Sequence, residues 1–136
     1  MPISHNITNL KTDFLGYIEV ERGRSLKTIE NYDRYLSDFI TTSNIKNAYD
    51  ITDNSIKLYR KTLNRREAQG KQLKKKTQNY YLIAIRMFLK YLARENIKSL
   101  SPERIELAKV GDRDLDLISH NELERLLQSP DTSKQT

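Results

Sequence analysis

The longest and most apolar helical segment of this chain is residues 75–95, which read KKTQNYYLIAIRMFLKYLARE. Five apolar or aromatic positions recur there at intervals of three and four residues, so on a helix they share one arc of about 100°. These positions are Tyr81, Ala84, Ile85, Phe88 and Leu92. The spacing predicts a long helix with one face in the core of an all-α domain.

The opposite side of this predicted helix carries cations along its whole length. Its members are Lys75, Asn79, Arg86 and Lys90, with Lys76 and Arg94 at the edge. A basic helix face is often only a solvated one, but solvated faces usually mix signs as i, i+4 pairs. From Lys71 to Arg94 the chain contains no Asp or Glu at all. We therefore expect this face to meet a polyanion.

The start of the same helix is a candidate phosphate site. Lys74, Lys75 and Lys76 stand there, followed by Thr77. The free N–H groups and the dipole of a helix N-terminus already favour anions, and the lysines add to that preference. Tyr80 flanks the basic face, where its ring could stack on a sugar or its hydroxyl could bond a phosphate.

The positive charge is concentrated in one part of the chain. The net charge of the 136 residues is +6, but residues 57–98 hold thirteen Lys and Arg against only Glu67 and Glu95. Residues 1–56 hold six basic against eight acidic side chains, and residues 99–136 hold five against eight. A charge confined to one segment is what a polyanion-binding surface requires.

A second helix is predicted from Ser25, its N-cap, to Thr42. Opposite its apolar stripe lie Lys27, Asn31 and Arg34, and Asn and Arg can read adenine and guanine edges in the major groove. Thr28 is a further candidate contact, although Ser and Thr at a helix start more often cap it. Because Asp38 would repel phosphate, contacts should be confined to the first half of this helix.

The remaining elements follow from caps, glycines and prolines. We expect a helix over 8–21, another from Thr52 to Ala68 ended by Gly70, and a short fifth helix at Ser101-Pro102-Glu103. Residues 110–117 form a charged linker, and Ser119 to Glu122 is a capping box that opens one more helix. The polar tail over 129–136 is predicted to be disordered.

Several classes of function are disfavoured by composition. The chain has no cysteine, and His5 and His120 show no ligand spacing, so we expect no metal, no cofactor and no disulfide. No segment is long and apolar enough to span a bilayer and no signal peptide is visible, which favours a cytoplasmic protein. No nucleophile with a neighbouring base stands out, and four of the tyrosines are best explained as core residues: Tyr32, Tyr59, Tyr81 and Tyr91.

Four motifs, taken in order and spacing, resemble the tyrosine recombinase or phage integrase family, including its Xer-like members. Residues 25–32, SLKTIENY, resemble the second-helix signature of its core-binding, SAM-like domain, and residues 77–92 resemble the fourth-helix signature. Residues 100–105, LSPERI, are similar to the short helix that follows, and residues 117–127 to the opening of the catalytic domain. One departure is Ile83, where the family often has a small polar residue.

The resemblance implies a compact four-helix core-binding domain over residues 1–109, a linker over 110–118, and the first helix of a truncated catalytic domain over 119–136. It implies double-stranded DNA as partner, with the second and fourth helices facing the major groove of a recombination half-site. Other recombinase subunits would join in DNA integration or recombination by the full-length protein. The family's catalytic His-x-x-Arg is absent, because Leu123 stands three residues after His120. We therefore expect no enzyme activity from this chain and no small-molecule substrate.

The predicted DNA-binding residues come from the second and fourth helices. They are Lys27, Thr28, Asn31, Arg34, Lys74, Lys75, Lys76, Thr77, Asn79, Tyr80, Arg86 and Lys90. Two alternatives stay open. One is a helical protein-interaction module whose basic face meets an acidic partner. The other is a small helix-turn-helix repressor, which ranks last because no short helix pair joined by a tight glycine turn is visible.

Overall fold

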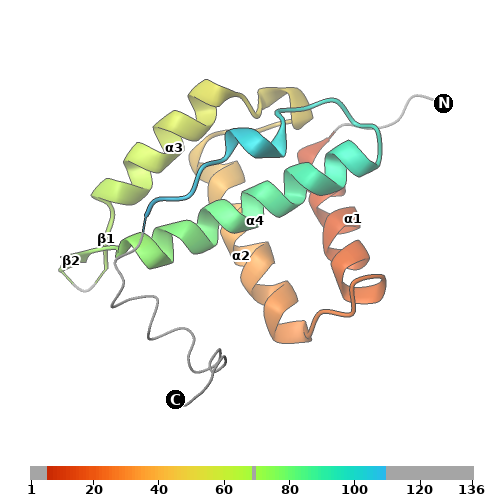
Figure 1. Ribbon diagram of the computed structural model, residues 1–136, viewed down its shortest axis with the longest axis horizontal. Helices are drawn as coiled ribbons and strands as arrows, with labels where there is room; N and C mark the ends of the chain where they lie inside the picture. Colours follow the sequence, from red (N-terminus) through yellow and green to blue (C-terminus); the bar gives the residue numbers. More distant parts are fainter. Residues whose placement is uncertain (1–5, 69, 110–136) are drawn as a thin grey trace, which may run out of the picture.

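The computed structural model describes residues 6–68 and 70–109 of the chain. This part folds into four α-helices: α1 (Ile7–Val20), α2 (Leu26–Thr42), α3 (Asp53–Arg65) and α4 (Lys75–Arg94). They gather around one core, with α4 crossing in front of α2 and α3 beside it (Figure 1). The predicted all-α fold is confirmed. The predicted linker and the predicted start of a second domain, over 110–136, lie outside the described residues.

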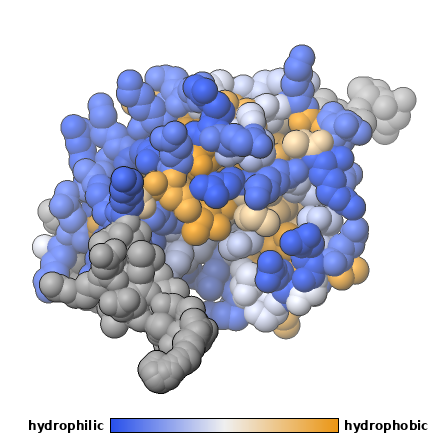
Figure 2. Space-filling view, in the orientation of Figure 1, coloured by the Kyte–Doolittle hydropathy of each residue, from blue (hydrophilic) through white to orange (hydrophobic). Residues whose placement is uncertain are grey.

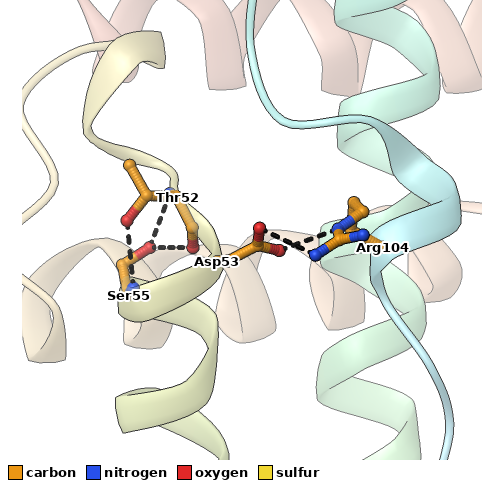
Figure 3. A network of polar contacts seen from close by, with 4 residues as sticks. All are labelled: Thr52, Asp53, Ser55 and Arg104. Atoms are coloured by element: carbon orange, nitrogen blue, oxygen red, sulfur yellow. Dashed lines mark hydrogen bonds and ion pairs between the residues drawn. The ribbon is translucent and has the colours of Figure 1, made fainter.

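Three of the helices begin at side-chain caps. Asn6 accepts from the backbone N–H groups of Thr8 and Asn9 at the start of α1, and Ser25 accepts from Thr28 at 3.2 Å in α2. Thr52 and Ser55 exchange bonds across the first turn of α3 (Figure 3). Such caps each stabilise a helix by about 1 kcal/mol. The start of α4 differs, because Lys74 provides no side-chain cap.

The core is built from aromatic and branched side chains of all four helices. Phe14 of α1 meets Phe88 of α4 edge to face at 5.5 Å, and Phe39 of α2 meets Tyr59 of α3 at 5.0 Å. Burial of each such side chain contributes about 1.5–3 kcal/mol. The predicted core face of α4 is confirmed, since Ala84, Ile85, Phe88 and Leu92 are at most 1% exposed, and Tyr81 packs at its margin.

The third helix is shorter than predicted. It ends at Arg65, not Ala68, and a two-stranded antiparallel hairpin follows, β1 (Glu67–Ala68) and β2 (Lys71–Gln72). Gly70, expected to end the helix, instead has φ +79° in the hairpin turn, where glycine avoids the strain of that conformation. The Gln72 amide donates to the Asn64 carbonyl at 2.8 Å, which satisfies one of the last acceptors of α3.

Two single 3₁₀ turns complete the described chain. η1 (Ala48–Asp50) precedes α3 and was not expected. The short helix expected at Ser101 is η2 (Pro102–Arg104), and it is anchored to the start of α3 because Arg104 binds both carboxylate oxygens of Asp53 at 3.0 Å (Figure 3). The chain from η2 to residue 109, which we call the strap, then runs between α3 and α4 (Figure 1).

Candidate nucleic-acid interface

Helix α4 has three faces and not the two that its periodicity predicted. One faces the core, as described above. A second is covered by the strap, which is bound there by Asn79 and Arg86. The third is open and is formed by positions about 60–140° around the helix from Lys75. We call it the free stripe, and its members are Lys76, Tyr80, Ile83, Met87 and Lys90.

The covered face corrects the expectation that Asn79 points outward. Asn79 is only 7% exposed, and its amide forms two hydrogen bonds with one strap residue. Its Nδ2 donates to the Ala108 carbonyl at 2.8 Å, and its Oδ1 accepts from the Ala108 N–H at 2.9 Å. The edge of the amide that would pair with a base through both Oδ1 and Nδ2 is occupied by Ala108 and buried, so in this conformation Asn79 holds the strap.

Arg86 also belongs to the covered face. Its Nη2 donates to the Ile105 carbonyl at 3.1 Å, and its Nε is buried with no hydrogen-bond partner among the described residues. Ile105 itself is 2% exposed and is part of the core. Arg60 of α3 donates to the next strap carbonyl, that of Glu106. The strap is therefore bound from both sides, and Arg86 is half-buried beneath it.

The free stripe has a cation at each end and aromatic and apolar side chains between them. Lys90 is exposed and Lys76 is half-buried, while Tyr80 between them is 41% exposed. Ile83 is half-buried yet does not pack against the core cluster, whereas Met87 does. On the face toward the viewer in Figure 2, hydrophobic surface lies in the middle of the molecule with hydrophilic surface around it. Ile83 and Met87 were not among the predicted contacts, although the helix period places them between Lys76 and Lys90.

The start of α4 presents a second group of cations. Lys74 and Lys75 are exposed, and Thr77 is half-buried in the first turn. The Lys75 Nζ donates to the Asn64 side chain at 2.6 Å, which ties this end of α4 to the end of α3. Since Lys74 gives no side-chain cap, the free N–H groups of the first turn remain available to an anion.

Helix α2 contributes its first half. Lys27 and Arg34 are exposed and Asn31 is half-buried, while the Thr28 hydroxyl accepts from the capping Ser25 at 3.1 Å. The Arg34 guanidinium lies 5.1 Å from the centre of the Tyr35 ring, a cation–π distance. These three polar positions share the surface opposite the core stripe, as the period predicted.

The two helices meet close to these side chains. Tyr35 of α2 and Tyr81 of α4 pack with ring centroids 4.6 Å apart. Arg34 and Tyr80 each precede one of these rings in the sequence, and both are exposed. The contact joins the middle of α2 to the first half of α4.

Asp38 does not act as the isolated negative charge that the sequence suggested. Its carboxylate accepts from the Tyr59 hydroxyl and from Arg66 Nη1 at 3.0 Å. Burial and this hydrogen bond raise the pKa of Tyr59 far above its ordinary value. Tyr59 is 1% exposed, and Tyr32, Tyr81 and Tyr91 pack against the core, so all four tyrosines expected in the core are found there.

Other kinds of site find little support in the described part of the chain. Across residues 6–68 and 70–109 no three His, Asp or Glu side chains come together as metal ligands would. Over the same residues, no helix combines the length and apolar character needed to cross a bilayer.

The sequence of this four-helix domain matches a known family. Residues 12–96 match the family described as phage integrase, N-terminal SAM-like domain, and the chain belongs to this family. The chain is similar to the tyrosine recombinase XerD of Chlamydia pneumoniae, with 28% identity over 130 residues, and to the tyrosine recombinase XerC of Bacillus licheniformis, with 29% identity over 132 residues. The resemblance seen in the sequence motifs is thereby confirmed.

The aligned regions differ greatly in their share of each protein. They cover 96% and 94% of this chain but 41% and 42% of the two recombinases. The chain thus spans about two fifths of the length of these curated relatives. No solved structure gave a significant match.

Proposed function

We propose that this chain is a DNA-binding module of a tyrosine recombinase and grips duplex DNA with one surface made by α2 and α4. The surface consists of the free stripe of α4, its N-terminal lysines, and the first half of α2. Its proposed contacts are Lys27, Asn31, Arg34, Lys74, Lys75, Lys76, Tyr80, Ile83, Met87 and Lys90. The lysines would bind phosphates, which positions the domain without reading sequence.

The observation that carries this proposal is that none of the cations on this surface forms an ion pair within the described residues, although Glu30 is exposed on the same side of α2 between Lys27 and Arg34. Within the described residues, the ion pairs involve Lys11, Arg66, Arg94 and Arg104, all outside it. Its own lysines and Arg34 form no ion pair with a described acid. Unpaired like charges on adjacent helices repel one another, and a phosphate backbone removes that repulsion while releasing counterions.

The α4 side of the surface suits the major groove. A helix fits that groove, and apolar groups contact the thymine methyl there. Ile83 and Met87 supply such groups in the middle of the free stripe, flanked by Lys76 and Lys90. Base discrimination would then come from methyl contacts and from Asn31 or Arg34, since Asn79 is engaged by the strap.

In the whole recombinase, this module would add affinity for a recombination half-site. Strand exchange would be carried out by another domain, with other recombinase subunits taking part. A basic module that binds an acidic protein is the competing function, and it predicts no affinity for DNA.

A salt series of duplex binding, with heparin as competitor, tests the proposal. Lys76→Ala and Lys90→Ala should each reduce the slope of log affinity against log salt by about one. Lys46→Ala and Lys98→Ala are the matched controls, because both lysines are exposed but lie in loops outside the surface. Undetectable binding by the unsubstituted chain at low salt, or equal effects of test and control variants, would contradict the proposal.

A further inference from the structure

Helix α3 carries a row of cations that the proposed DNA surface does not include. Lys57, Lys61 and Arg65 are spaced by four residues and are all exposed. They lie opposite the buried side of the helix, which is formed by Ile56, Tyr59 and Leu63. We call this row the α3 ridge. Because the helix is held by its buried side, the backbone positions of the three residues form a line about 12 Å long.

The ridge has no internal counter-charge. None of its three side chains forms an ion pair with any residue in the described ranges, and the acidic residue one turn before Lys57, Asp53, is taken by Arg104 (Figure 3). Like charges four residues apart destabilise a helix by a few tenths of a kcal/mol per pair. The row therefore favours a partner that brings several negative charges in a line.

The ridge and the free stripe lie on opposite sides of the strap. Arg60, which belongs to the flank of α3 next to the ridge, donates to the Glu106 carbonyl, and Asn79 and Arg86 hold the same strap to α4. Figure 1 shows the strap passing between the two helices. The two cationic rows are therefore separate along most of their length.

The rows converge at the hairpin. Asn64, next to Arg65, accepts from Lys75 Nζ at 2.6 Å through its side chain and from Gln72 through its carbonyl. Exposed Lys71 and Lys74 stand on either side of Gln72 and Leu73. The C-terminal end of the ridge thus joins the N-terminal lysines of α4, so the cationic surface continues from α4 around the hairpin onto α3.

We propose that the α3 ridge binds the sugar–phosphate backbone of the same duplex, beyond the segment under α2 and α4. One strand carries a phosphate about every 3.4 Å of helix axis, so the ridge matches three or four successive phosphates. These contacts carry no base information and lengthen the DNA segment that the domain holds. The inference rests on the proposed DNA-binding function and adds a second, sequence-independent contact to it.

The length of the duplex distinguishes binding by the α3 ridge from binding by the proposed surface of α2 and α4, which we call the main surface. Helix α4 is about 30 Å long, equal to about nine base pairs, so a duplex of about 10 base pairs fits the main surface alone. A duplex of about 20 base pairs can reach the ridge as well. Binding of the full chain to both would be measured over a salt series for Lys57→Gln/Lys61→Gln, with Lys46→Gln/Lys98→Gln as control of equal charge change.

The ridge variant should bind the longer duplex with a salt slope smaller by about two, because each lost phosphate contact removes about 0.9. On the shorter duplex it should match the control. Equal behaviour of the ridge variant and the control on the longer duplex would overturn the ridge and leave the main surface intact. Failure of the unsubstituted chain to bind either duplex would overturn the DNA-binding function itself.

Discussion

Replacing Asn79 with alanine separates the two roles that this residue could have. The substitution removes both hydrogen bonds to Ala108 and leaves the Ala108 N–H and carbonyl without their partners. Each bond contributes about 0.5–1.5 kcal/mol net, and a buried group left unpaired costs more. Asn79→Ala should therefore weaken the docking of the strap by about 2 kcal/mol.

Two assays report that loss. Amide hydrogen exchange should become faster at Ala108, although Arg60, Arg86 and the buried Ile105 would still hold the rest of the strap. Where the strap stays coupled to global unfolding, the melting temperature of a domain of this size should fall by roughly 10 °C. Lys90→Ala is the matched control on the same helix, because Lys90 is exposed and should leave both measurements unchanged.

A base-reading role of Asn79 would give a different result. If Asn79 read a base, Asn79→Ala would cost about 1–3 kcal/mol of affinity at particular base pairs and would not affect the exchange of the strap amides. Unchanged exchange at Ala108 together with a base-specific loss of DNA affinity would refute the assignment of Asn79 to the strap.

Three further predictions follow from single contacts. Replacing thymine by deoxyuridine in a bound duplex should weaken binding by the unsubstituted chain more than by Ile83→Ala; equal weakening would exclude a methyl contact by Ile83. The raised pKa of Tyr59 means that its neutral form stabilises the fold, so its contribution to the free energy of unfolding should be fully present below about pH 10 and be lost above it; Tyr59→Phe should reduce the fall in denaturant-measured stability at alkaline pH. Gly70→Ala should reduce the free energy of unfolding by about 1 kcal/mol, because φ +79° strains any side chain there; an unchanged urea midpoint would contradict this.

The sequence predicted the helices that bury a regular stripe. For α1, α2 and α4 the caps and the spacing of apolar residues gave bounds close to those observed, within one or two residues. The end of α3 was missed because Gly70 fits a helix end and a hairpin turn equally well. The hairpin forms because Ala68 pairs with Lys71. Strands of two residues are too short to show an alternating pattern in the sequence, so this pairing could not be predicted.

The candidate site was predicted less well than the fold, and for a physical reason. A helical wheel divides α4 into a core side and a solvent side, and Asn79 and Arg86 fall on the solvent side. Both are covered by a strap that follows about twenty to thirty residues later, and periodicity within α4 holds no information about it. Lys27, Arg34 and Lys90 are exposed, as the helical wheel predicted for them.

Mapping the bound face residue by residue tests the proposed DNA surface most directly. Backbone amide shifts of the isotope-labelled chain would be followed by NMR during titration with a duplex of about 10 base pairs, the length that α4 can span. We predict the largest changes at Lys27 to Arg34 and from Lys74 to Lys90 along the free stripe, with little change at Val20 or Lys46. Changes centred on α1, or no changes at low salt, would contradict a DNA surface built from α2 and α4.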